Sequence, residues 1–124
     1  PSVLRVPHSN KVGKHPVMIC LQGHSKGMHI SLGRTKYDGD EATIKGGDRD
    51  FCIRAVKEGY AAIALEQRNF GECGGKPGYA DCTYSKLIAE LFGRTTIGER
   101  VWDLQRLIDV LENEFSDKID VKNN

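Results

Sequence analysis

The stretch Val17-Met-Ile-Cys-Leu-Gln-Gly-His-Ser-Lys-Gly-Met-His29 decides the fold, because a short apolar run in it stops abruptly at Gly23. The run Val17–Leu21 is apolar on both faces and lies between a proline and a glycine, a pattern typical of a parallel strand covered by helices on both sides. In open α/β sheets, ligands bind beyond the carboxyl ends of such strands. Gly23, His24 and Ser25 are therefore expected at the edge of the sheet where a substrate would bind.

Two further segments extend this strand into a βαβ unit. Residues Asp48–Glu58 place apolar side chains on one face at helical spacing, and Gly59 follows as a C-terminal cap. Tyr60–Leu65 is a second apolar run, and strands joined by a helical crossover are parallel. A short strand over Ser2–Val6 is expected to enter the sheet as a hairpin with Val17–Leu21. The predicted class is α/β, a mostly parallel sheet with flanking helices.

The C-terminal third predicts two helices. One covers roughly residues 84–92, and a longer one starts at Thr96, whose hydroxyl is expected to cap it in a capping box with Glu99. The apolar residues of the longer helix recur at spacings of four and three, and they are Ile97, Val101, Leu104, Ile108, Leu111 and Phe115. This stripe predicts packing on the sheet. Residues 118–124 are expected to approach a further strand.

Composition and charge exclude several partners. The chain has 39% hydrophobic and 28% charged residues, and no stretch approaches the ~20 apolar residues that a membrane helix needs. The net charge of +1 comes from interspersed acidic and basic residues, without the basic stripe of a nucleic-acid-binding protein. We expect no nucleic acid, membrane or cofactor as partner. A cytoplasmic location is expected because the N-terminus lacks a basic and then apolar signal.

The cysteines and histidines do not predict a metal site. Cys20, Cys52, Cys73 and Cys82 form no C-x-x-C pair, so reduced structural thiols are expected. Cys73 and Cys82 share a glycine-rich loop and would close a small disulfide only in an exported protein.

Metal-ligand residue types also occur in the polar, glycine-punctuated segment that follows Gly27. His24 and His29, with Asp38 and Asp40, have no recognised ligand spacing. We expect these four residues to be solvated loop residues and no metal to be bound.

Three segments in order carry a resemblance to a known family. They are Ile19-Cys-Leu-Gln-Gly-His24, Ala64-Leu-Glu-Gln-Arg-Asn-Phe-Gly-Glu72 and Gly98-Glu-Arg-Val-Trp-Asp-Leu-Gln-Arg-Leu-Ile-Asp-Val-Leu111. Their order resembles the N-terminal half of α/β-hydrolases over about residues 17–121, and the acetyl xylan esterase and dienelactone hydrolase-like branch in particular. The resemblance implies an oxyanion loop after the first strand and a nucleophile strand after the long helix. Gln22, Glu66 and Asn69 stand where that family usually has His, Asp and Gly.

Gly23 and the backbone N–H of His24 are the residues that this resemblance assigns to the oxyanion loop. Ester cleavage develops negative charge on the carbonyl oxygen, and a fixed N–H donor aimed at that oxygen lowers the barrier by ~2.7 to 4 kcal/mol. A glycine lets the backbone approach the substrate closely. The alternative is that Gly23 only ends a strand in a tight turn. Arg68 either anchors the neighbouring loops by hydrogen bonds to carbonyls or is a solvated surface arginine.

Ser25 lies in a literal G-x-S-x-G match, Gly23 to Gly27, but its context does not fit a nucleophile elbow. An elbow runs directly into a helix, whereas glycines break the segment after Met28. All four histidines occur at or before His29, while the triad of this fold places its acid and base after the serine. We therefore predict that Ser25 is not a nucleophile.

The sequence thus predicts the N-terminal portion of a serine ester hydrolase of the carboxylesterase or acetyl esterase type. Residues 1–124 would form a single α/β domain portion, truncated before the nucleophile strand and inactive alone. Its substrate would be a small ester, with acetylated carbohydrates among the expected substrates. The free side of Val17–Leu21 should be covered by the remaining chain or a second copy, because exposed apolar edges invite pairing. The alternative function is a non-catalytic α/β module that binds a ligand or partner.

Overall fold

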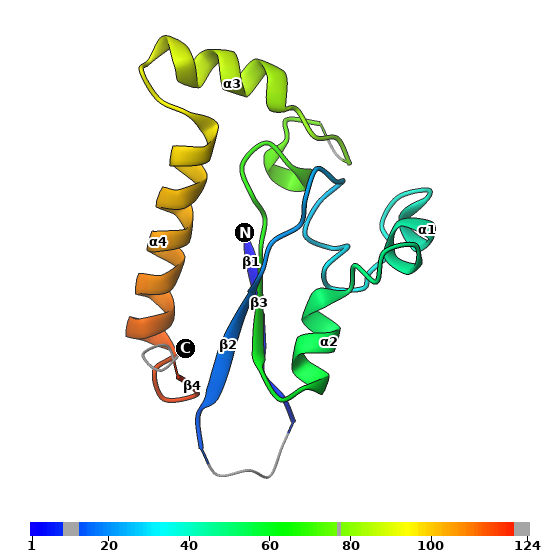
Figure 1. Cartoon of the computed structure of the whole chain (residues 1–124), viewed down its shortest axis with the longest axis vertical. Helices are drawn as coiled ribbons and strands as arrows, with labels where there is room; N and C mark the ends of the chain where they lie inside the picture. Colours follow the sequence, from blue (N-terminus) through cyan, green and yellow to red (C-terminus); the bar gives the residue numbers. More distant parts are fainter. Residues whose placement is uncertain (9–12, 77, 121–124) are drawn as a thin grey trace.

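The computed structural model describes residues 1–8, 13–76 and 78–120 (Figure 1). These residues form an α/β fold, as predicted, with a four-stranded mixed sheet and helices on both of its faces. The strands are β1 (Ser2–Arg5), β2 (His15–Cys20), β3 (Ala61–Leu65) and β4 (Ile119–Asp120). The helices are α1 (Asp40–Lys45), α2 (Phe51–Lys57), α3 (Cys82–Leu91) and α4 (Thr96–Glu114), with a 3-10 turn, η1 (Gly71–Cys73).

The strand order is β1-β3-β2-β4. β2 and β3 are parallel, with Val17 opposite Ala61, so the predicted βαβ unit is confirmed. β1 is antiparallel to β3 and does not pair with β2, so the predicted hairpin is wrong. The arrangement places strands on both edges of β3, the most apolar strand, and so satisfies the backbone groups of a segment that is almost wholly buried.

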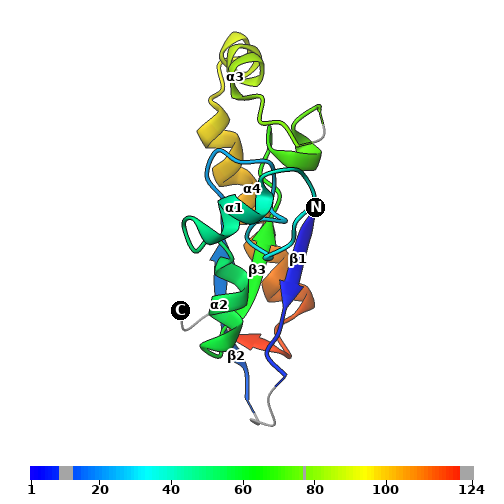
Figure 2. The ribbon, with the colours of Figure 1, turned by 90° about the vertical axis from the view of Figure 1, so that its right-hand side faces the viewer.

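β3 separates two layers of core, one on each face of the sheet. Ala62 and Ala64 pack on the face covered by α2, in a cluster with Cys20, Leu32, Cys52 and Ala55. Ala61 and Ile63 point to the opposite face and pack against Leu107 and Leu111 of α4. Figure 2 shows α2 and α4 on opposite sides of the strands. Alternation along β3 therefore divides the core, because successive side chains of a strand point to opposite faces.

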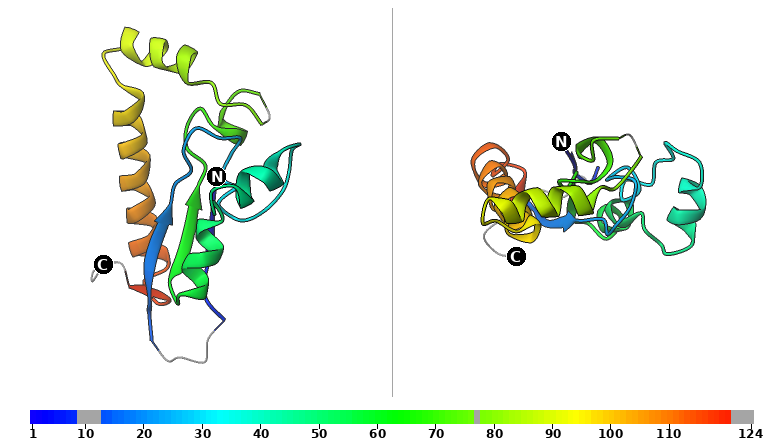
Figure 3. Two further views of the ribbon diagram at one scale, coloured as in Figure 1. Left: turned by 45° about the vertical axis from the view of Figure 1, so that its right-hand side comes forward. Right: turned by 90° about the horizontal axis from the view of Figure 1, so that it is seen from above.

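The apolar stripe predicted for α4 is only partly correct. Leu104, Leu107, Leu111 and Phe115 contact the sheet face, whereas Ile97, Val101 and Ile108 are exposed. Figure 1 shows the first turns of α4 beyond the ends of the strands, where α3 crosses the end of the molecule (Figure 3). The N-terminal half of the stripe therefore has no sheet beneath it.

The cap of α4 also differs from the prediction by one residue. Thr95, in extended conformation, is the N-cap, and its Oγ1 accepts a hydrogen bond from the Gly98 N–H (3.0 Å). Thr96 is the first helical residue and its hydroxyl caps nothing. The carboxylate of Glu99 pairs with arginines instead of closing a capping box. Thr95 and Thr96 are both suitable N-cap residues by type, and the extended backbone of Thr95 makes Thr95 the cap.

The segment after Gly27 is more ordered than a polar loop. Ile30 and Leu32 are buried, and a series of turns is closed by bonds such as Leu32 N–H to the Met28 carbonyl (3.2 Å). The short helix α1 follows, which the glycine-rich sequence did not predict. None of the helices in the described ranges is long and apolar enough to cross a membrane.

The edge of the sheet beyond β2 is paired with β4, so the prediction that residues 118–124 only approach a further strand is wrong at Ile119 and Asp120. β4 is parallel to β2, with Ile119 opposite His15 and Asp120 opposite Pro16. Residues 121–124, the rest of that prediction, lie outside the described residues. On the α2 face, Met18 of β2 is 41% exposed, so the prediction that helices cover both faces of this strand is wrong there.

Candidate functional site

The loops that follow the parallel strands β2 and β3 meet through buried polar side chains. Gln22 follows β2 after one intervening residue, Leu21, and Glu66 comes directly after β3, and both are buried. Glu66 Oε1 accepts hydrogen bonds from Gln22 Nε2 (2.8 Å) and from the backbone N–H of Met28 (3.0 Å). The side chain of Gln67 donates to the Gln22 carbonyl. The start of each loop is therefore tied to the other.

Two glycines make room for the Glu66 carboxylate. A Cβ on Gly71 would lie 2.4 Å from Glu66 Oε2, and one on Gly27 would lie 2.9 Å from it. Both glycines also have positive φ, 49° for Gly71 and 144° for Gly27, which side-chain-bearing residues adopt at a cost. These positions require glycine for close approach.

Burial raises the pKa of the Glu66 carboxyl above its ordinary value, and the N–H groups of Met28 and Glu72 lower it by less. A buried acid without a close cation favours its neutral form.

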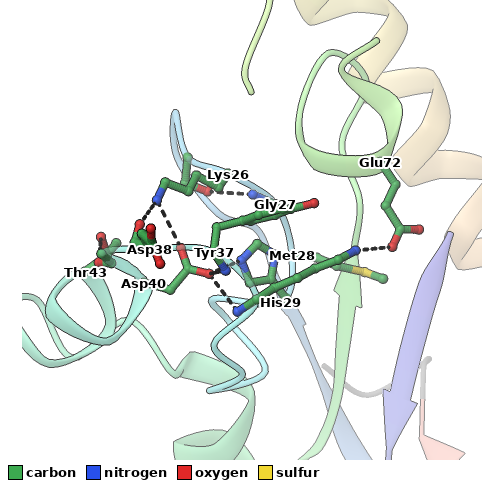
Figure 4. Close-up of polar contacts among 12 residues, drawn as sticks. Lys26, Gly27, Met28, His29, Tyr37, Asp38, Asp40, Thr43 and Glu72 are labelled. Carbon is green, nitrogen blue, oxygen red and sulfur yellow. Dashed lines mark hydrogen bonds and ion pairs between the residues drawn. The ribbon is translucent and has the colours of Figure 1, made fainter. Parts of the chain in front are cut away.

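A second buried carboxylate, Asp40, holds the next part of the loop (Figure 4). Its Oδ2 contacts His29 Nε2 (2.9 Å) and accepts hydrogen bonds from the backbone N–H groups of Lys36 (2.9 Å) and Tyr37 (2.7 Å). Lys26 Nζ lies 3.5 Å from Oδ1 and also donates to the Asp38 carbonyl. Asp40 therefore ties Lys26 and His29 to the turn that precedes α1.

Desolvation would raise the pKa of Asp40, but the donors around it prevail. The N–H groups of Lys36 and Tyr37, together with His29, lower the pKa of this carboxyl below its ordinary value. Asp40 is therefore an anion held by hydrogen bonds.

His24 and Asp38 are exposed, as expected, whereas the expectation of a solvated loop residue is wrong for Asp40 and for the half-buried His29. Asp40 is 1% exposed and is paired with His29, whose ring also lies edge-on to Tyr37. His24 lies apart from this pair, with its ring edge-on to Phe70 (5.7 Å between centroids). Among the described residues, no three His, Cys, Asp or Glu side chains form a group that could hold a metal ion.

Gly23 and His24, the predicted oxyanion residues, lie at the open part of the same loop. No atom lies within 4 Å of the position that a Cβ on Gly23 would occupy. Within the described ranges, neither backbone N–H makes a hydrogen bond. Both residues line a pocket of about 370 Å³ with Gln22, Ser25, Ile30, Ser31, Arg49 and Phe51. Two residues whose backbone N–H groups have no partner in the described ranges therefore line a space that a small ligand can enter.

Ser25 lines this pocket, but its hydroxyl accepts a long hydrogen bond from the Gly27 N–H (3.4 Å). No histidine in the described residues makes a hydrogen bond to Ser25. The residues that follow form turns and no helix until α1, unlike a nucleophile elbow.

Arg68 anchors the β3 loop, although by carboxylates and not by the expected carbonyls. Its Nε and Nη2 donate to the two oxygens of Asp103 (2.6 and 2.8 Å), and its Nη1 donates to Glu99 (3.0 Å). The hydrogen bonds to Asp103 raise the pKa of the guanidinium above its already high value. Arg100 of α4 donates in turn to the Arg68 carbonyl (3.0 Å). The loop is therefore tied to α4 by bidentate geometry that lysine could not supply.

All four cysteines are free, so Cys73 and Cys82 do not form the disulfide that the sequence left open. Cys20 and Cys52 are buried in the core under α2, as expected for structural thiols.

The sequence did not identify Gln22, Glu66 and Asp40 as the residues that build the site. A usable signal existed for the first two, because polar residues that follow closely after adjacent parallel strands converge at one edge of a sheet. Asp40 gave no such signal, since its donors are backbone N–H groups of a turn that the sequence pattern did not predict.

Comparisons with known proteins add no family assignment. No family model matches the sequence, and no curated protein matches it significantly.

Proposed function

We propose that this chain is the N-terminal portion of a serine ester hydrolase of the carboxylesterase or acetyl esterase type, and that Gly23 and His24 form its oxyanion loop. The observation that carries the proposal is that Gly23 and His24, whose backbone N–H groups have no partner in the described residues, line a pocket at the carboxyl end of β2. Fixed N–H donors in such a place stabilise the oxyanion of acyl transfer without reorganisation.

The position of β4 supports this proposal. In the family that the sequence resembles, the strand after the long helix lies beside the strand that leads to the oxyanion loop and is followed by the nucleophile. β4 follows α4, pairs with β2 and runs in the same direction as β2. Its direction therefore points toward the end of the sheet at which Gly23 lies.

The contacts of the local serine and histidine favour a triad contributed from outside residues 1–120. Ser25 Oγ accepts from a backbone N–H, and the ring of His29 is held by Asp40. We propose that neither residue performs nucleophilic or base chemistry, that the 124-residue chain alone does not turn over esters, and that no cofactor takes part. The substrate would be a small ester, with acetylated carbohydrates included in the class.

The test compares hydrolysis of p-nitrophenyl acetate by the 124-residue chain and by the full reading frame that encodes it. We expect turnover only from the longer protein, because loss of the triad costs a factor of ~10⁶ in the serine protease case. A fluorophosphonate probe should label the longer protein at a serine other than Ser25. Labelling of Ser25, with loss of turnover in Ser25→Ala, would refute the proposal.

A specific observation also favours the second candidate, a non-catalytic module that binds a partner. A hollow of about 540 Å³ lies along β2 and α2, and its apolar lining includes Met18, Phe51 and Tyr60. The remaining chain or a second copy would cover this hollow beside β2. If neither protein hydrolyses esters and the short chain sediments as a dimer that Met18→Lys dissociates, the binding module is the better account.

A further inference from the structure

Helix α3 carries a stripe of large apolar side chains that the described part of the chain does not cover. The α3 stripe consists of four residues of the helix and its C-cap, Tyr84, Leu87, Ile88, Leu91 and Phe92. These side chains are between 38% and 84% exposed, and Leu91 is the most exposed of them. Amphipathic helices normally bury such a stripe, and contiguous exposed apolar surface marks an interaction site.

The α3 stripe lies on the side of the helix away from the rest of the molecule. Ala89 is the buried residue of α3. Because successive residues of an α-helix are about 100° apart, Ala89 lies about 160° around the helix from both Leu87 and Leu91. The helix itself crosses the end of the molecule (Figures 1 and 3). A partner can therefore reach the stripe without displacing any part of the described chain.

The spacing of the α3 stripe is the same in both chain directions. Tyr84, Leu87, Ile88 and Leu91 follow one another at intervals of three, one and three residues. If two copies of α3 lie antiparallel, with a two-fold axis between Leu87 and Ile88, Tyr84 of one copy lies beside Leu91 of the other. Every position of the stripe then meets an apolar side chain. A two-fold interface requires such self-complementarity, so the stripe suits a second copy of the same helix.

The charges around the α3 stripe favour a protein partner over a lipid surface. Lys86 pairs with Glu90 on the helix (3.6 Å), and Arg94, just after it, pairs with Glu99 (3.6 Å). Helices that lie on membranes carry an excess of lysine and arginine on the polar face, whereas these pairs are neutral. Two neutral rims also do not repel each other when identical surfaces meet.

We propose that α3 forms an antiparallel, two-fold symmetric contact with α3 of a second copy of this chain. Five side chains of this exposure offer on the order of 500 Å² per copy, so the pair buries on the order of 1,000 Å², the lower limit of a specific interface. The dimer is therefore reversible, with a Kd on the order of 10 μM. The contact is separate from the hollow beside β2 and does not depend on ester hydrolysis.

The test is sedimentation velocity over a range of protein concentrations, with the 124-residue chain and with the protein of the full reading frame. Both should dimerise as the concentration passes through the Kd. Leu91→Lys should raise the Kd at least about 100-fold, because it places two charges in the apolar contact. The exposed Leu91 has little packing to lose, and lysine suits the last turn of a helix, so α3 stays folded.

A charge swap tests the antiparallel arrangement. Tyr84→Glu alone should dissociate the dimer like Leu91→Lys. The double variant Tyr84→Glu/Leu91→Lys should recover at least about tenfold of the lost affinity at low salt, because each new carboxylate meets the new ammonium group of the other copy. In a parallel pair, like charges would meet and no affinity would return.

Two further substitutions are matched controls, since each also replaces an exposed apolar residue by lysine. Val110→Lys changes the second half of α4, and Met18→Lys changes the hollow beside β2. Both variants should dimerise like the parent chain. Dissociation by Met18→Lys would instead place the contact at that hollow and overturn the inference.

The remaining outcomes also decide the question. The inference is overturned if both proteins stay monomeric, if Leu91→Lys dimerises like the parent chain, or if the double variant recovers no affinity. A longer protein that stays monomeric while the short chain dimerises would show that the remaining chain covers the α3 stripe. Binding of the monomer to phosphatidylcholine vesicles, lost in Leu91→Lys, would assign the stripe to lipid. Since none of these measurements involves hydrolysis, the proposed esterase succeeds or fails separately.

Discussion

Asp40 and Glu66 are both buried carboxylates that clamp the loop after β2, yet their surroundings shift their ionisation in opposite directions. Asp40 accepts from two backbone N–H groups and faces His29 and Lys26, and its pKa is lowered. Glu66 has neutral donors and its burial prevails, so its pKa is raised. Burial alone therefore does not determine whether a carboxyl group is charged. The number and charge of its hydrogen-bond donors also shift its pKa.

The two carboxylates act on consecutive residues. Glu66 holds the N–H of Met28, and Asp40 holds the ring of His29. A few residues earlier, the N–H groups of Gly23 and His24 have no partner in the described part of the chain, and both residues line the pocket. A preorganised oxyanion loop requires a base that is held in place and a tip whose N–H groups make no internal hydrogen bonds, so that they remain available to the substrate.

Asp40→Ala should be the most damaging change, lowering the free energy of unfolding by about 4 kcal/mol, because it removes a buried ionic group and leaves several donors without a partner. Glu66→Ala should cost about 2 kcal/mol, since two neutral hydrogen bonds are lost. Urea denaturation of both variants measures the difference. An equal cost would mean that charge does not distinguish the two clamps.

Gly71→Ala should lower stability by about 3 kcal/mol, because the new methyl group would press on the Glu66 carboxylate and the residue must keep a positive φ. The same urea experiment applies. A neutral result would show that the β3 loop moves freely away from Glu66.

The opposite pKa shifts predict opposite dependences of stability on pH. A raised folded pKa makes the Glu66 contribution complete below its unfolded pKa of ~4.3 and lost as the pH rises through the folded value. The Asp40 contribution is present above ~3.9 and is lost as the pH falls through its lowered folded pKa.

Unfolding free energies at a series of pH values test both signs. Relative to wild type, Glu66→Gln should gain stability as the pH rises above ~4.3, by less than about 1.4 kcal/mol per pH unit. The lower free energy of unfolding of Asp40→Asn should approach that of the wild type as the pH falls below ~3.9. Parallel curves for the wild type and either variant would contradict the shift at that residue.

Gly23→Ala should have the smallest effect on stability, within about 0.5 kcal/mol, because the methyl group meets no atom and the φ of this residue is not positive. Thermal unfolding beside Gly71→Ala makes the contrast between the two glycines direct. A large loss in Gly23→Ala would mean that this glycine only serves a tight turn.

The α/β class, the βαβ unit and the position of Gly23 after a strand could be predicted, because apolar runs and glycines mark them in the sequence. The pairing of β1 could not, since Ser2–Arg5 carries no signal for which edge of β3 it joins. The exposed Ile97 and Val101 show a similar limit, because periodicity identifies an apolar face but not how far the sheet extends beneath it. The role of Asp40 depends on the backbone N–H groups of a turn that local patterns do not encode, whereas the position of Glu66 directly after β3 is a signal that the sequence does carry.

The most direct test of the central claim is the kcat for p-nitrophenyl acetate of Gly23→Ala in the full reading frame. The added methyl group would occupy the space through which an ester reaches the N–H groups of Gly23 and His24. We expect kcat to fall about 100-fold while the unfolding temperature stays the same. An unchanged kcat in a folded variant would contradict the assignment of this loop to the oxyanion.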